Sequence, residues 1–494
     1  MAYYIGIDLG TSAAKLLLMD ESGAICNIVA REYPLEFPKP GWSQQDPQHW
    51  RRALMTGVPE LLAHVDAGKV RGVACAGQMH GLVALDENDQ VIRPAILWND
   101  GRTAAQVEYL NGVIGKKRLS GLTGNIAFAG FTAPKLLWMR EHEPQAFARI
   151  RRIMLPKDYI NYILTGVHAC DYSDASGTLL LDVKNKRWSQ EMLELCGLSL
   201  AQMPSLYESS ACIGMVKPDI ARALGLPQGV LVAAGAGDNA AAAVGTGVVG
   251  DGGCNISLGT SGTVFVSSAR FAADPNNALH AFAHADGGYH LMGCMLSAAS
   301  CNKWFAEDIL HGGDYAAEQA AIGTDRLGRN PVFFLPYLMG ERSPINDTSA
   351  RAAFIGMSMD TSRADLTQAV LEGVAFAIRD SVEVARSLGV HIPASRLCGG
   401  GAKSPLWRKI LANVLAMPLE SPASEQGPGM GAAMLAMTAC GAFESVQAAC
   451  AALVKTAGVT LPDAALTACY ERQYQKYRLL YPALKDVFPR LQEE

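Results

Sequence analysis

The chain carries the same four-residue turn, Leu-Gly-Thr-Ser, at residues 9–12 and again at residues 258–261, in its two halves. An apolar strand candidate precedes each turn and another follows it, so Tyr3–Asp20 and Cys254–Ser267 are both typical of β-hairpins. Glycine and small hydroxyl residues suit a tight turn close to a ligand. Four residues alone are a weak repeat, but their position after a strand in both halves predicts two domains of related design.

The length of 494 residues also favours more than one domain, because a single hydrophobic core rarely grows this large. With 49% hydrophobic and 18% charged residues, the composition is that of a folded, core-rich protein. Strand and helix candidates alternate, which predicts an α/β fold. We place the domain boundary in the glycine-rich stretch Thr246–Gly253, which gives domains of residues 1–247 and 248–494.

Charge and hydropathy exclude several classes of partner. A net charge of −5 offers no attraction to nucleic acid or to an anionic membrane. The N-terminus has no secretory signal, and no apolar run is long enough to span a bilayer, so we expect a cytoplasmic protein. The 12 cysteines form no CxxC pair and no zinc spacing. We therefore expect them to be reduced and mostly buried.

Hydrophobic periodicity predicts six helices and several further strands. Short strands are expected at Val70–Ala76, Leu82–Leu85, Pro94–Trp98 and Val230–Ala234. The helices are expected at Asp46–Ala63, Pro134–Glu141, Leu296–Ile309, Arg363–Leu388, Pro405–Leu415 and Gly431–Ala439.

The first hairpin has the residue types of a phosphate site. Asp8 ends the strand, and Gly10, Thr11 and Ser12 form a turn whose N–H and hydroxyl groups could cradle phosphate oxygens. A carboxylate beside such a turn can hold Mg²⁺, often through water. Lys15 could add positive charge or lie on a solvent face. An ordinary polar hairpin is the alternative, but the second copy of the turn favours phosphate binding, because an interdomain nucleotide cleft needs donors from both sides.

A third glycine-rich segment, Cys398–Ser404, precedes the helix predicted at Pro405. Three glycines before a helix N-terminus allow a flat or anionic group to approach the backbone. A lone glycine run is more often a turn without a ligand. The sequence contains neither a Walker A motif nor the protein-kinase motifs, so ATP would bind through another architecture.

Asp238 is the candidate proton acceptor. It follows a strand and a Gly-x-Gly turn and begins an alanine-rich helix. We expect the helix N-terminus to keep this carboxylate ionised and ready to accept a proton. The alternative is that Asp238 only caps the helix. The glycines that open space before it, and Asn239 beside it, favour the catalytic interpretation.

Polar residues after two other strands are candidates for sugar recognition. Met79 and His80 follow one strand, and Arg102 follows another, where Trp98 could offer an apolar wall. The alternatives are a loop histidine that is satisfied by its neighbours and a local ion pair of Arg102 with Asp100, which would contribute little.

Five segments in this order resemble the FGGY family of carbohydrate kinases: residues 8–12 (DLGTS), 77–81 (GQMHG), 237–239 (GDN), 258–261 (LGTS) and 399–402 (GGGA). Three further segments, at residues 94–102, 131–135 and 155–159, share the resemblance. It extends from the first strand to about Ala439. The Gln-Met-His segment is the most specific of these.

The resemblance implies an α/β protein of two domains with the actin-like ATPase, ribonuclease H-like fold and a nucleotide cleft between them. It implies that the N-terminal domain binds a small ketose, with D-xylulose as the leading expectation, and that the C-terminal domain binds ATP with Mg²⁺. It also suggests a homodimer. The implied site residues are Asp238 as general base, Asp8 as the carboxylate for Mg²⁺–ATP, Met79, His80, Asp238 and Asn239 on the sugar, Gly259 and Thr260 on phosphate, and Gly400, Gly401 and Ala402 on the nucleotide.

Three alternatives stay open. One is a kinase of the same family for ribulose, xylitol or gluconate. Another is an actin- or chaperone-like ATPase, and the last is a sugar sensor without catalysis. The kinase hypothesis depends on one geometric expectation, namely that Asp8 and Asp238 face each other across a single interdomain gap that also admits a triphosphate.

Overall fold

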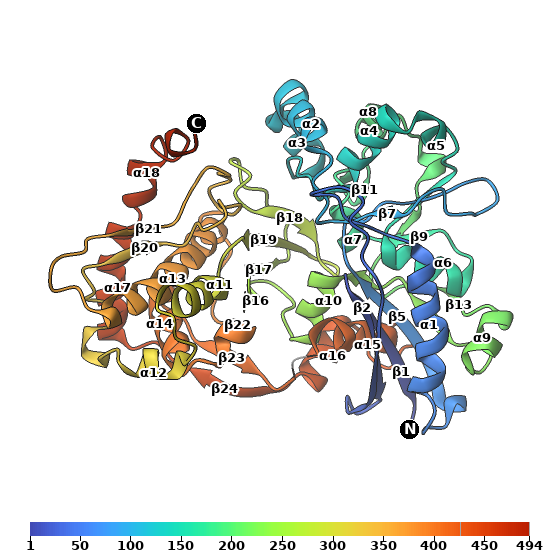
Figure 1. Cartoon of the computed structure of the whole chain (residues 1–494). Coiled ribbons are helices and arrows are strands. Elements are labelled where there is room, and N and C mark those ends of the chain that lie inside the picture. Colours follow the sequence, from blue (N-terminus) through green and yellow to red (C-terminus); the bar gives the residue numbers. More distant parts are fainter. Residues whose placement is uncertain (425, 494) are drawn as a thin grey trace.

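The protein, in the form of a computed structural model, contains two seven-stranded mixed β-sheets that lie side by side (Figure 1). The structure describes residues 1–424 and 426–493. The N-terminal sheet has the order β13-β14-β5-β1-β2-β3, with β15 also paired to β5. Its strands, in that order, span Cys212–Met215, Leu231–Ala233, Val70–Gly77, Tyr3–Leu9, Ala13–Asp20, Ile25–Glu32 and Ala236–Gly237. The C-terminal sheet has the order β18-β19-β17-β16-β22-β23-β24, with strands at His280–Ala283, Tyr289–Met295, Gly262–Ser268, Cys254–Leu258, Ser395–Cys398, Leu419–Pro422 and Thr456–Thr460.

The two sheets repeat one topology. Each begins with the predicted hairpin, β1–β2 or β16–β17, whose turn is Leu-Gly-Thr-Ser. The first strand of each hairpin pairs in parallel with a later strand, β5 or β22, and a second parallel strand, β14 or β23, follows. An antiparallel strand, β13 or β24, then closes that edge. The shared order confirms the predicted α/β fold with two halves of related design.

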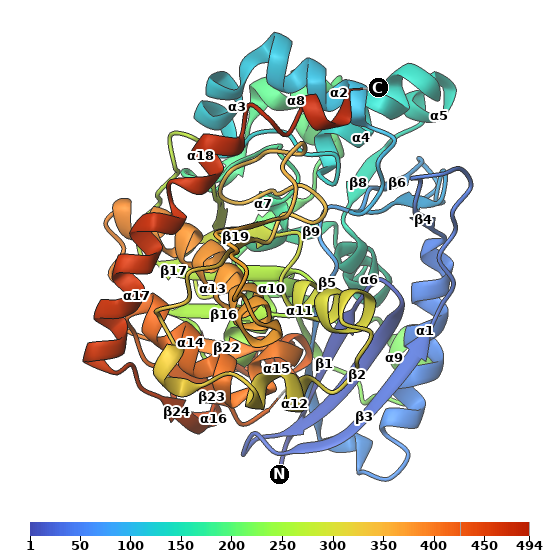
Figure 2. The same ribbon diagram turned by 60° about the vertical axis from the view of Figure 1, so that its left-hand side comes forward.

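Helices cover both sheets (Figures 1 and 2). They span α1 Pro47–Leu61, α2 Ala104–Glu108, α3 Lys116–Thr123, α4 Thr132–His142, α5 Pro144–Ala148, α6 Pro156–Thr165, α7 Tyr172–Ser176, α8 Gln190–Cys196, α9 Pro218–Leu224, α10 Asp238–Gly245, α11 Ala299–Trp304, α12 Tyr315–Ala320, α13 Arg363–Ser387, α14 Pro405–Leu415, α15 Gly427–Ala439, α16 Val446–Leu453, α17 Ala464–Tyr477 and α18 Leu480–Leu484. Short strand pairs complete the fold: β4 Gln44–Gln45 with β7 Ala95–Ile96, β6 Val83–Leu85 with β8 Arg152–Met154, β9 Ala169–Asp171 with β12 Ser205–Tyr207, β10 Leu181–Asp182 with β11 Arg187–Trp188, and β20 Phe333–Leu335 with β21 Ala353–Ile355.

The predicted helices are present, with errors at their ends. Helices α1, α13 and α14 begin and end close to the predicted positions, and the side chain of Asp46 caps α1 by accepting from the N–H of Gln48 at 2.9 Å. The segment predicted as helix from Leu296 becomes α11 only at Ala299, and it widens into a π-helical turn from Phe305. Helix α15 starts earlier than predicted, at Gly427.

Two helices join the halves of the molecule. Helices α10 and α15 pack against each other between the sheets, and both views show them at the centre (Figures 1 and 2). The contact is too close for side chains: a Cβ on Gly245 would lie 2.0 Å from the carbonyl oxygen of Gly427, and one on Gly431 would lie 1.9 Å from that of Ala241. Small residues at these positions therefore fix the distance between the helices.

The two halves do not separate cleanly along the chain. Helices α15 and α16 follow the C-terminal sheet strand β23, yet their apolar residues share one buried cluster with β1, β2 and β5 of the N-terminal sheet. Met434 and Ala436, for example, are completely buried in the cluster that contains Leu17 and Ala74. Residues 427–454 therefore pack on the N-terminal sheet, and the boundary at residues 247 and 248 stays a prediction.

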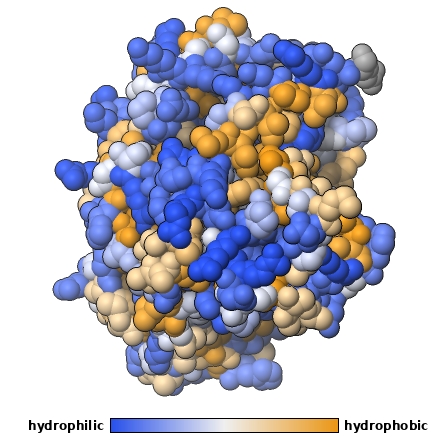
Figure 3. Space-filling view, turned by 90° about the vertical axis from the view of Figure 1, so that its left-hand side faces the viewer, coloured by the Kyte–Doolittle hydropathy of each residue, from blue (hydrophilic) through white to orange (hydrophobic). Residues whose placement is uncertain are grey.

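The surface and the cysteines agree with most of the expectations. No helix in residues 1–424 and 426–493 is both long enough and apolar enough to cross a membrane. Hydrophilic side chains cover much of the face in Figure 3, with apolar side chains gathered in patches between them. All 12 cysteines are free thiols; six are buried and four half-buried, whereas Cys26 and Cys212 are exposed, so the expectation that most are buried is met by only half of them.

Candidate active site

Three strands bring the predicted catalytic and sugar-binding segments to one edge of the N-terminal sheet. Strands β1 and β15 both run parallel to β5, and Gly77 is the register partner of both Leu9 and Gly237. The carboxyl ends of these strands therefore lie in one row. Asp8, Met79, His80 and Asp238 emerge at this row, although they are far apart in the sequence.

Asp8 lies close enough to Asp238 for its charge to affect the ionisation of Asp238. Burial, and next the negative charge of Asp8, raise the pKa of Asp238 to about 7. Burial raises the pKa of Asp8 to about 6, although the charge of Lys15 opposes this. The expectation that the helix N-terminus keeps Asp238 ionised is therefore wrong in direction: loss of water and a like charge outweigh the helix dipole. Both residues also belong to the N-terminal sheet edge, so they do not face each other from opposite halves.

The turn before Asp238 holds its carboxylate in a defined orientation. Gly235 has φ +75°, and a Cβ there would lie 2.0 Å from the carbonyl oxygen of Cys75, so only glycine fits. Asp238 is the first residue of α10, whose N-cap is Gly237, and this excludes the capping alternative. Its Oδ1 accepts from the backbone N–H of Asn239 at 2.7 Å and from the Asn239 side chain at 2.9 Å. Within the described residues Oδ2 has no donor, so it can accept a proton from a substrate.

His80 presents one ring nitrogen to the site. Its Nδ1 donates to the carbonyl oxygen of Gly177 at 2.7 Å. Burial, and next the charge of Lys135, lower the pKa of His80 to about 3, so the ring is neutral. A neutral ring with a hydrogen on Nδ1 has Nε2 as an acceptor, which suits a sugar hydroxyl. The ammonium of Lys135 donates to the His80 carbonyl oxygen at 2.8 Å and supports the unusual φ of +70° at this residue.

Aromatic side chains from both halves surround His80. Phe131 stacks on its ring, with centroids 4.8 Å apart. We use the name aromatic wall for Phe128, Phe131, His280 and Phe282, whose rings contact one another with centroids 5.0–6.1 Å apart. Met79 completes the group, packed so tightly on Gly237 that a Cβ there would lie 2.9 Å from its sulfur. Only Met79 and His80 of this group are predicted by the sequence.

Arg102 does not reach the site, which corrects its prediction as a sugar-binding residue. Its side chain has no exposed surface and forms an ion pair of 2.8 Å with the equally buried Asp100. The guanidinium lies over the ring of Trp42 at 3.9 Å. The alternative interpretation, a local ion pair, is confirmed, but the pair is buried in the N-terminal half and does not lie on the surface.

Trp98 lies beside the phosphate-type turn. It is 45% exposed, and its indole N–H donates to the hydroxyl of Thr11 at 2.9 Å. It therefore borders the sheet edge, and contact with a sugar stays a prediction.

The first Leu-Gly-Thr-Ser turn is held by a buried glutamine. Gln45, which the sequence does not suggest as functional, donates to the carbonyl oxygen of Thr11 at 2.7 Å. The carbonyl oxygen of Gly10 accepts from the hydroxyl of Tyr33 at 2.6 Å, and Ser12 is exposed. Lys15 is the register partner of Asp8 across the hairpin, so both side chains leave the same face. Lys15 therefore faces the carboxylate and not only solvent.

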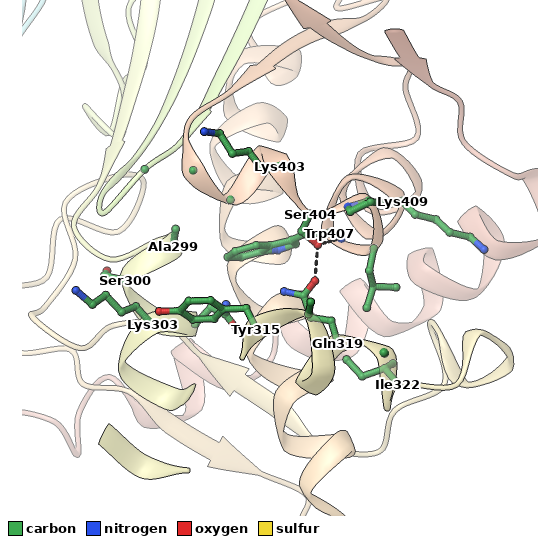
Figure 4. A pocket seen from close by; sticks show the side chains of 18 of the residues that line it. Ala299, Ser300, Lys303, Tyr315, Gln319, Ile322, Lys403, Ser404, Trp407 and Lys409 are labelled. Atoms are coloured by element: carbon green, nitrogen blue, oxygen red, sulfur yellow. Dashed lines mark hydrogen bonds between the residues drawn. The ribbon is translucent and has the colours of Figure 1, made fainter. Parts of the chain in front are cut away.

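The second turn opens onto a large cavity in the C-terminal half. Strands β16 and β22 are parallel, with Ser257 opposite Cys398, so the turn at Gly259 and the glycine loop at Gly400 lie at one sheet edge. The cavity has a volume of about 1250 Å³ (Figure 4). Its lining includes the predicted Gly259, Thr260, Gly400 and Gly401. Ala402 is not part of this lining; it packs against the C-terminal core.

Several lining residues are not predicted by the sequence. The floor and sides of the cavity are formed by α11, α12 and α14, which contribute Ser300, Asn302, Lys303, Tyr315, Gln319 and Trp407. Figure 4 shows Ser404 at the centre of a hydrogen-bonded group: its hydroxyl donates to Gln319 at 2.5 Å and accepts from the N–H of Trp407 at 3.0 Å. These residues have no shared motif, because they come from separate helices.

Family profiles match most of the chain. The N-terminal domain of the FGGY family of carbohydrate kinases matches residues 3–245, and its C-terminal domain matches residues 254–440. The chain belongs to the FGGY family. The sheet edge with Asp8 and Asp238 and the cavity at the second turn are the candidate sites of this carbohydrate kinase.

Individual FGGY relatives are similar over their full length. A xylulose kinase of Escherichia coli (strain K12) is 42% identical over 483 residues, covering 97% of this chain and 99% of that enzyme. Among solved structures, a xyloylose kinase from Brucella ovis has 40% identity and a TM-score of 0.93, covering 98% of this chain and 100% of that one. A gluconate kinase from Lactobacillus acidophilus has the same TM-score of 0.93 at 26% identity, covering 99% and 100%.

The residues at the N-terminal edge fit a magnesium ion bound together with a nucleotide. The described parts of the chain contain no group of three or more His, Cys, Asp or Glu side chains that could hold a metal alone. Asp8 is a partly buried carboxylate beside a turn rich in N–H and hydroxyl groups. Mg²⁺ usually keeps several waters and takes one or two carboxylates plus phosphate oxygens, which is the set that Asp8 and a nucleotide would supply.

Proposed function

We propose that this FGGY enzyme transfers the γ-phosphoryl group of ATP to the terminal hydroxyl of D-xylulose, giving D-xylulose 5-phosphate. The observation that carries this proposal is the convergence of Asp8, Met79, His80 and Asp238 at one sheet edge. The xylulose kinase of Escherichia coli, similar along nearly the whole chain, indicates the sugar.

Asp238 acts as the general base in this proposal. The hydroxyl of the ketose donates to Oδ2 while Asn239 holds Oδ1. A carboxyl with a pKa of about 7 is a stronger base than an ordinary aspartate, and about half of it is ionised at neutral pH. His80 Nε2 and Asn239 orient the other hydroxyls, and Met79 offers an apolar contact.

The nucleotide occupies the cavity of the C-terminal half. Its base and ribose lie between the helices α11, α12 and α14, and its phosphates extend past Gly259 and Thr260 toward the turn at Gly10, Thr11 and Ser12. Asp8 would hold Mg²⁺, which neutralises phosphate charge and orients the transferred group. Lys15 adds positive charge on the same face as Asp8. Closure of the two halves would exclude water and limit hydrolysis of ATP.

A sugar panel tests the proposal. The purified enzyme with Mg²⁺–ATP is offered D-xylulose, D-ribulose, xylitol and D-gluconate, and ADP release is followed. The expected result is the highest kcat/KM with D-xylulose. A higher kcat/KM with D-gluconate would make D-gluconate the substrate in place of D-xylulose. D-gluconate is included because the fold is also similar to that of a gluconate kinase, at 26% identity. ATP hydrolysis stimulated by peptide, or sugar binding without ADP release, would instead favour a chaperone-like ATPase or a sensor. Cytoplasmic location and a homodimer stay predictions from the sequence.

A further inference from the structure

Arg342 is a guanidinium from the C-terminal half that lies on the aromatic wall of the sugar site. Its guanidinium carbon is 5.3 Å from the ring centre of Phe128. Phe128 contacts Phe131 at 5.6 Å, and Phe131 stacks on His80 at 4.8 Å. Arg342 and His80, which come from different halves of the chain, therefore border the same space.

The backbone around Arg342 is fixed, so its side chain is held in place. The N–H of Ser343 donates to the carbonyl oxygen of Cys294 in β19 at 2.9 Å. The carboxylate of Glu341, which is 2% exposed, accepts the N–H groups of Arg342 and Leu296 at 2.7 and 2.8 Å. These bonds attach the Arg342 segment to the C-terminal sheet, and any movement of that sheet carries Arg342 with it.

The guanidinium of Arg342 has no partner of opposite charge. In residues 1–424 and 426–493 no carboxylate forms an ion pair with it, although the side chain is half-buried. The face of the Phe128 ring attracts the positive charge. The five N–H groups point outward in the plane of the guanidinium, so the ring accepts no hydrogen bond from them. A partly buried cation without a countercharge is costly unless a ligand supplies strong acceptors.

Ring contacts connect Arg342 to His80 through Phe128 and Phe131, so Arg342 borders the site on the side of the aromatic wall. Burial chiefly raises the pKa of the Cys294 thiol; the charge of Arg342 and a hydrogen bond with its side chain lower this pKa, and the charges of Glu341 and Asp238 raise it, so the thiol lies within reach of Arg342 and Asp238. Asp238 takes the terminal hydroxyl in the proposed reaction. A five-carbon ketose that extends from Asp238 along His80 toward the aromatic wall would direct its C1 and C2 oxygens toward Arg342.

We propose that Arg342 is a specificity-determining residue that donates hydrogen bonds to the C2 carbonyl oxygen and the C1 hydroxyl of the ketose. The planar fork of an arginine suits two neighbouring oxygens. Because Arg342 belongs to the C-terminal half and His80 to the N-terminal half, the sugar bridges both. This inference rests on the proposed function and adds to it the group that distinguishes a ketose from a polyol.

The test compares D-xylulose with its two C2 reduction products, xylitol and D-arabinitol, in the full-length enzyme with Mg²⁺–ATP. Arg342→Met should lower kcat/KM for D-xylulose by about 10- to 100-fold, as loss of hydrogen bonds to a charged donor does. The kcat/KM values for the two polyols, which lack the carbonyl, should change by less than about 3-fold, which is the effect of weakening a neutral hydrogen bond. Arg342→Lys, which keeps the charge, should recover part of the D-xylulose activity.

A matched control separates this role from a structural one. Arg270→Met removes an exposed arginine of the same half and should leave all three substrates unchanged. If Arg342→Met lowers kcat/KM equally for the ketose and the polyols, or does not lower it at all, the inference is overturned. Circular dichroism identifies a variant that fails to fold. In that case Arg342→Gln, whose side chain has a similar shape, is tested by the same ratio of kcat/KM for D-xylulose to kcat/KM for the polyols. Failure of the wild-type enzyme to phosphorylate D-xylulose would overturn the proposed function and this inference together.

Discussion

The backbone N–H of Gly237 donates to the hydroxyl of Ser173 at 3.1 Å, and this bond connects the catalytic turn to a buried ionic network. The hydroxyl of Ser173 in turn donates to Asp171 at 2.5 Å, and Asp171 forms an ion pair of 2.9 Å with Lys157. All three side chains are shielded from solvent. The residue before Asp238 is therefore positioned by charges that never contact substrate.

Ser173→Ala should lower kcat by about 10-fold or more, because small displacements of a catalytic group cost heavily. The hydrogen bond to Gly237 is lost, so the Asp238 carboxylate is no longer held in place. The KM for ATP should not change, since the nucleotide cavity is formed by the other half. Steady-state kinetics would check this, with Ser387→Ala, an exposed serine of α13, as the control. Unchanged kcat in Ser173→Ala would show that the network does not position the turn.

Asp238→Ala should lower kcat by at least about 100-fold, the usual contribution of a general base. Nucleotide binding should persist, because no residue of the nucleotide cavity is altered. Rapid-mixing assays of ADP formation and calorimetric titration with ATP measure the two quantities separately. Turnover close to that of the wild type would remove Asp238 from its proposed role.

Asp238→Asn should stabilise the ligand-free protein in a pH-dependent way. In the folded protein the carboxyl of Asp238 has a pKa of about 7, whereas an unperturbed aspartate has a pKa of 3.8. Between these pH values the folded state therefore binds more protons than the unfolded state. Stability of the wild type therefore falls as pH rises from about 4 to about 7. The variant should be more stable than the wild type at pH 8, and this difference should disappear as pH approaches 4.

Urea unfolding at several pH values measures this difference. Asp8→Asn should act in the same direction but over a window that ends near pH 6, the pKa of Asp8. A pH-independent difference for Asp238→Asn would mean that the carboxyl is not destabilised by its surroundings. A gain in stability with a loss of activity is common at active sites.

The sheet edge could be predicted from the sequence because its residues lie in segments with local signals. Asp8 lies at the end of an apolar strand, His80 and Asp238 each follow one, and all three have glycines nearby; parallel strands place such ends together. The aromatic wall and Arg342 give no local signal, since a phenylalanine or arginine in a loop has the same pattern whether it faces core, solvent or ligand. The position of Arg102 could not be predicted either, because its burial depends on Trp42 and Trp138, which are distant in the sequence.

Asp100→Asn should destabilise the protein by about 3–5 kcal/mol, because it leaves the Arg102 guanidinium buried without its countercharge. Glu191→Gln offers a matched control: its ion pair with Arg118 is exposed, at 42% and 57%, and its loss should cost less than about 1 kcal/mol. Urea titration of both variants gives the two values. In the folded fraction of Asp100→Asn the KM for sugar should stay near that of the wild type, and a large rise would restore Arg102 as a sugar-binding residue.

Gly431→Ala should damage both stability and catalysis through the contact of α10 with α15. The new methyl group would lie 1.9 Å from the carbonyl oxygen of Ala241, so the helices must move apart. Overpacking of this kind typically costs about 1–3 kcal/mol. Asp238 is the first residue of α10, so the same displacement should also lower kcat. Gly121→Ala, in α3 where a Cβ meets nothing within 4 Å, should be neutral or stabilising by up to about 1 kcal/mol, because alanine favours a helix. Equal behaviour of the two variants would show that the helix contact tolerates a side chain and does not set the position of Asp238.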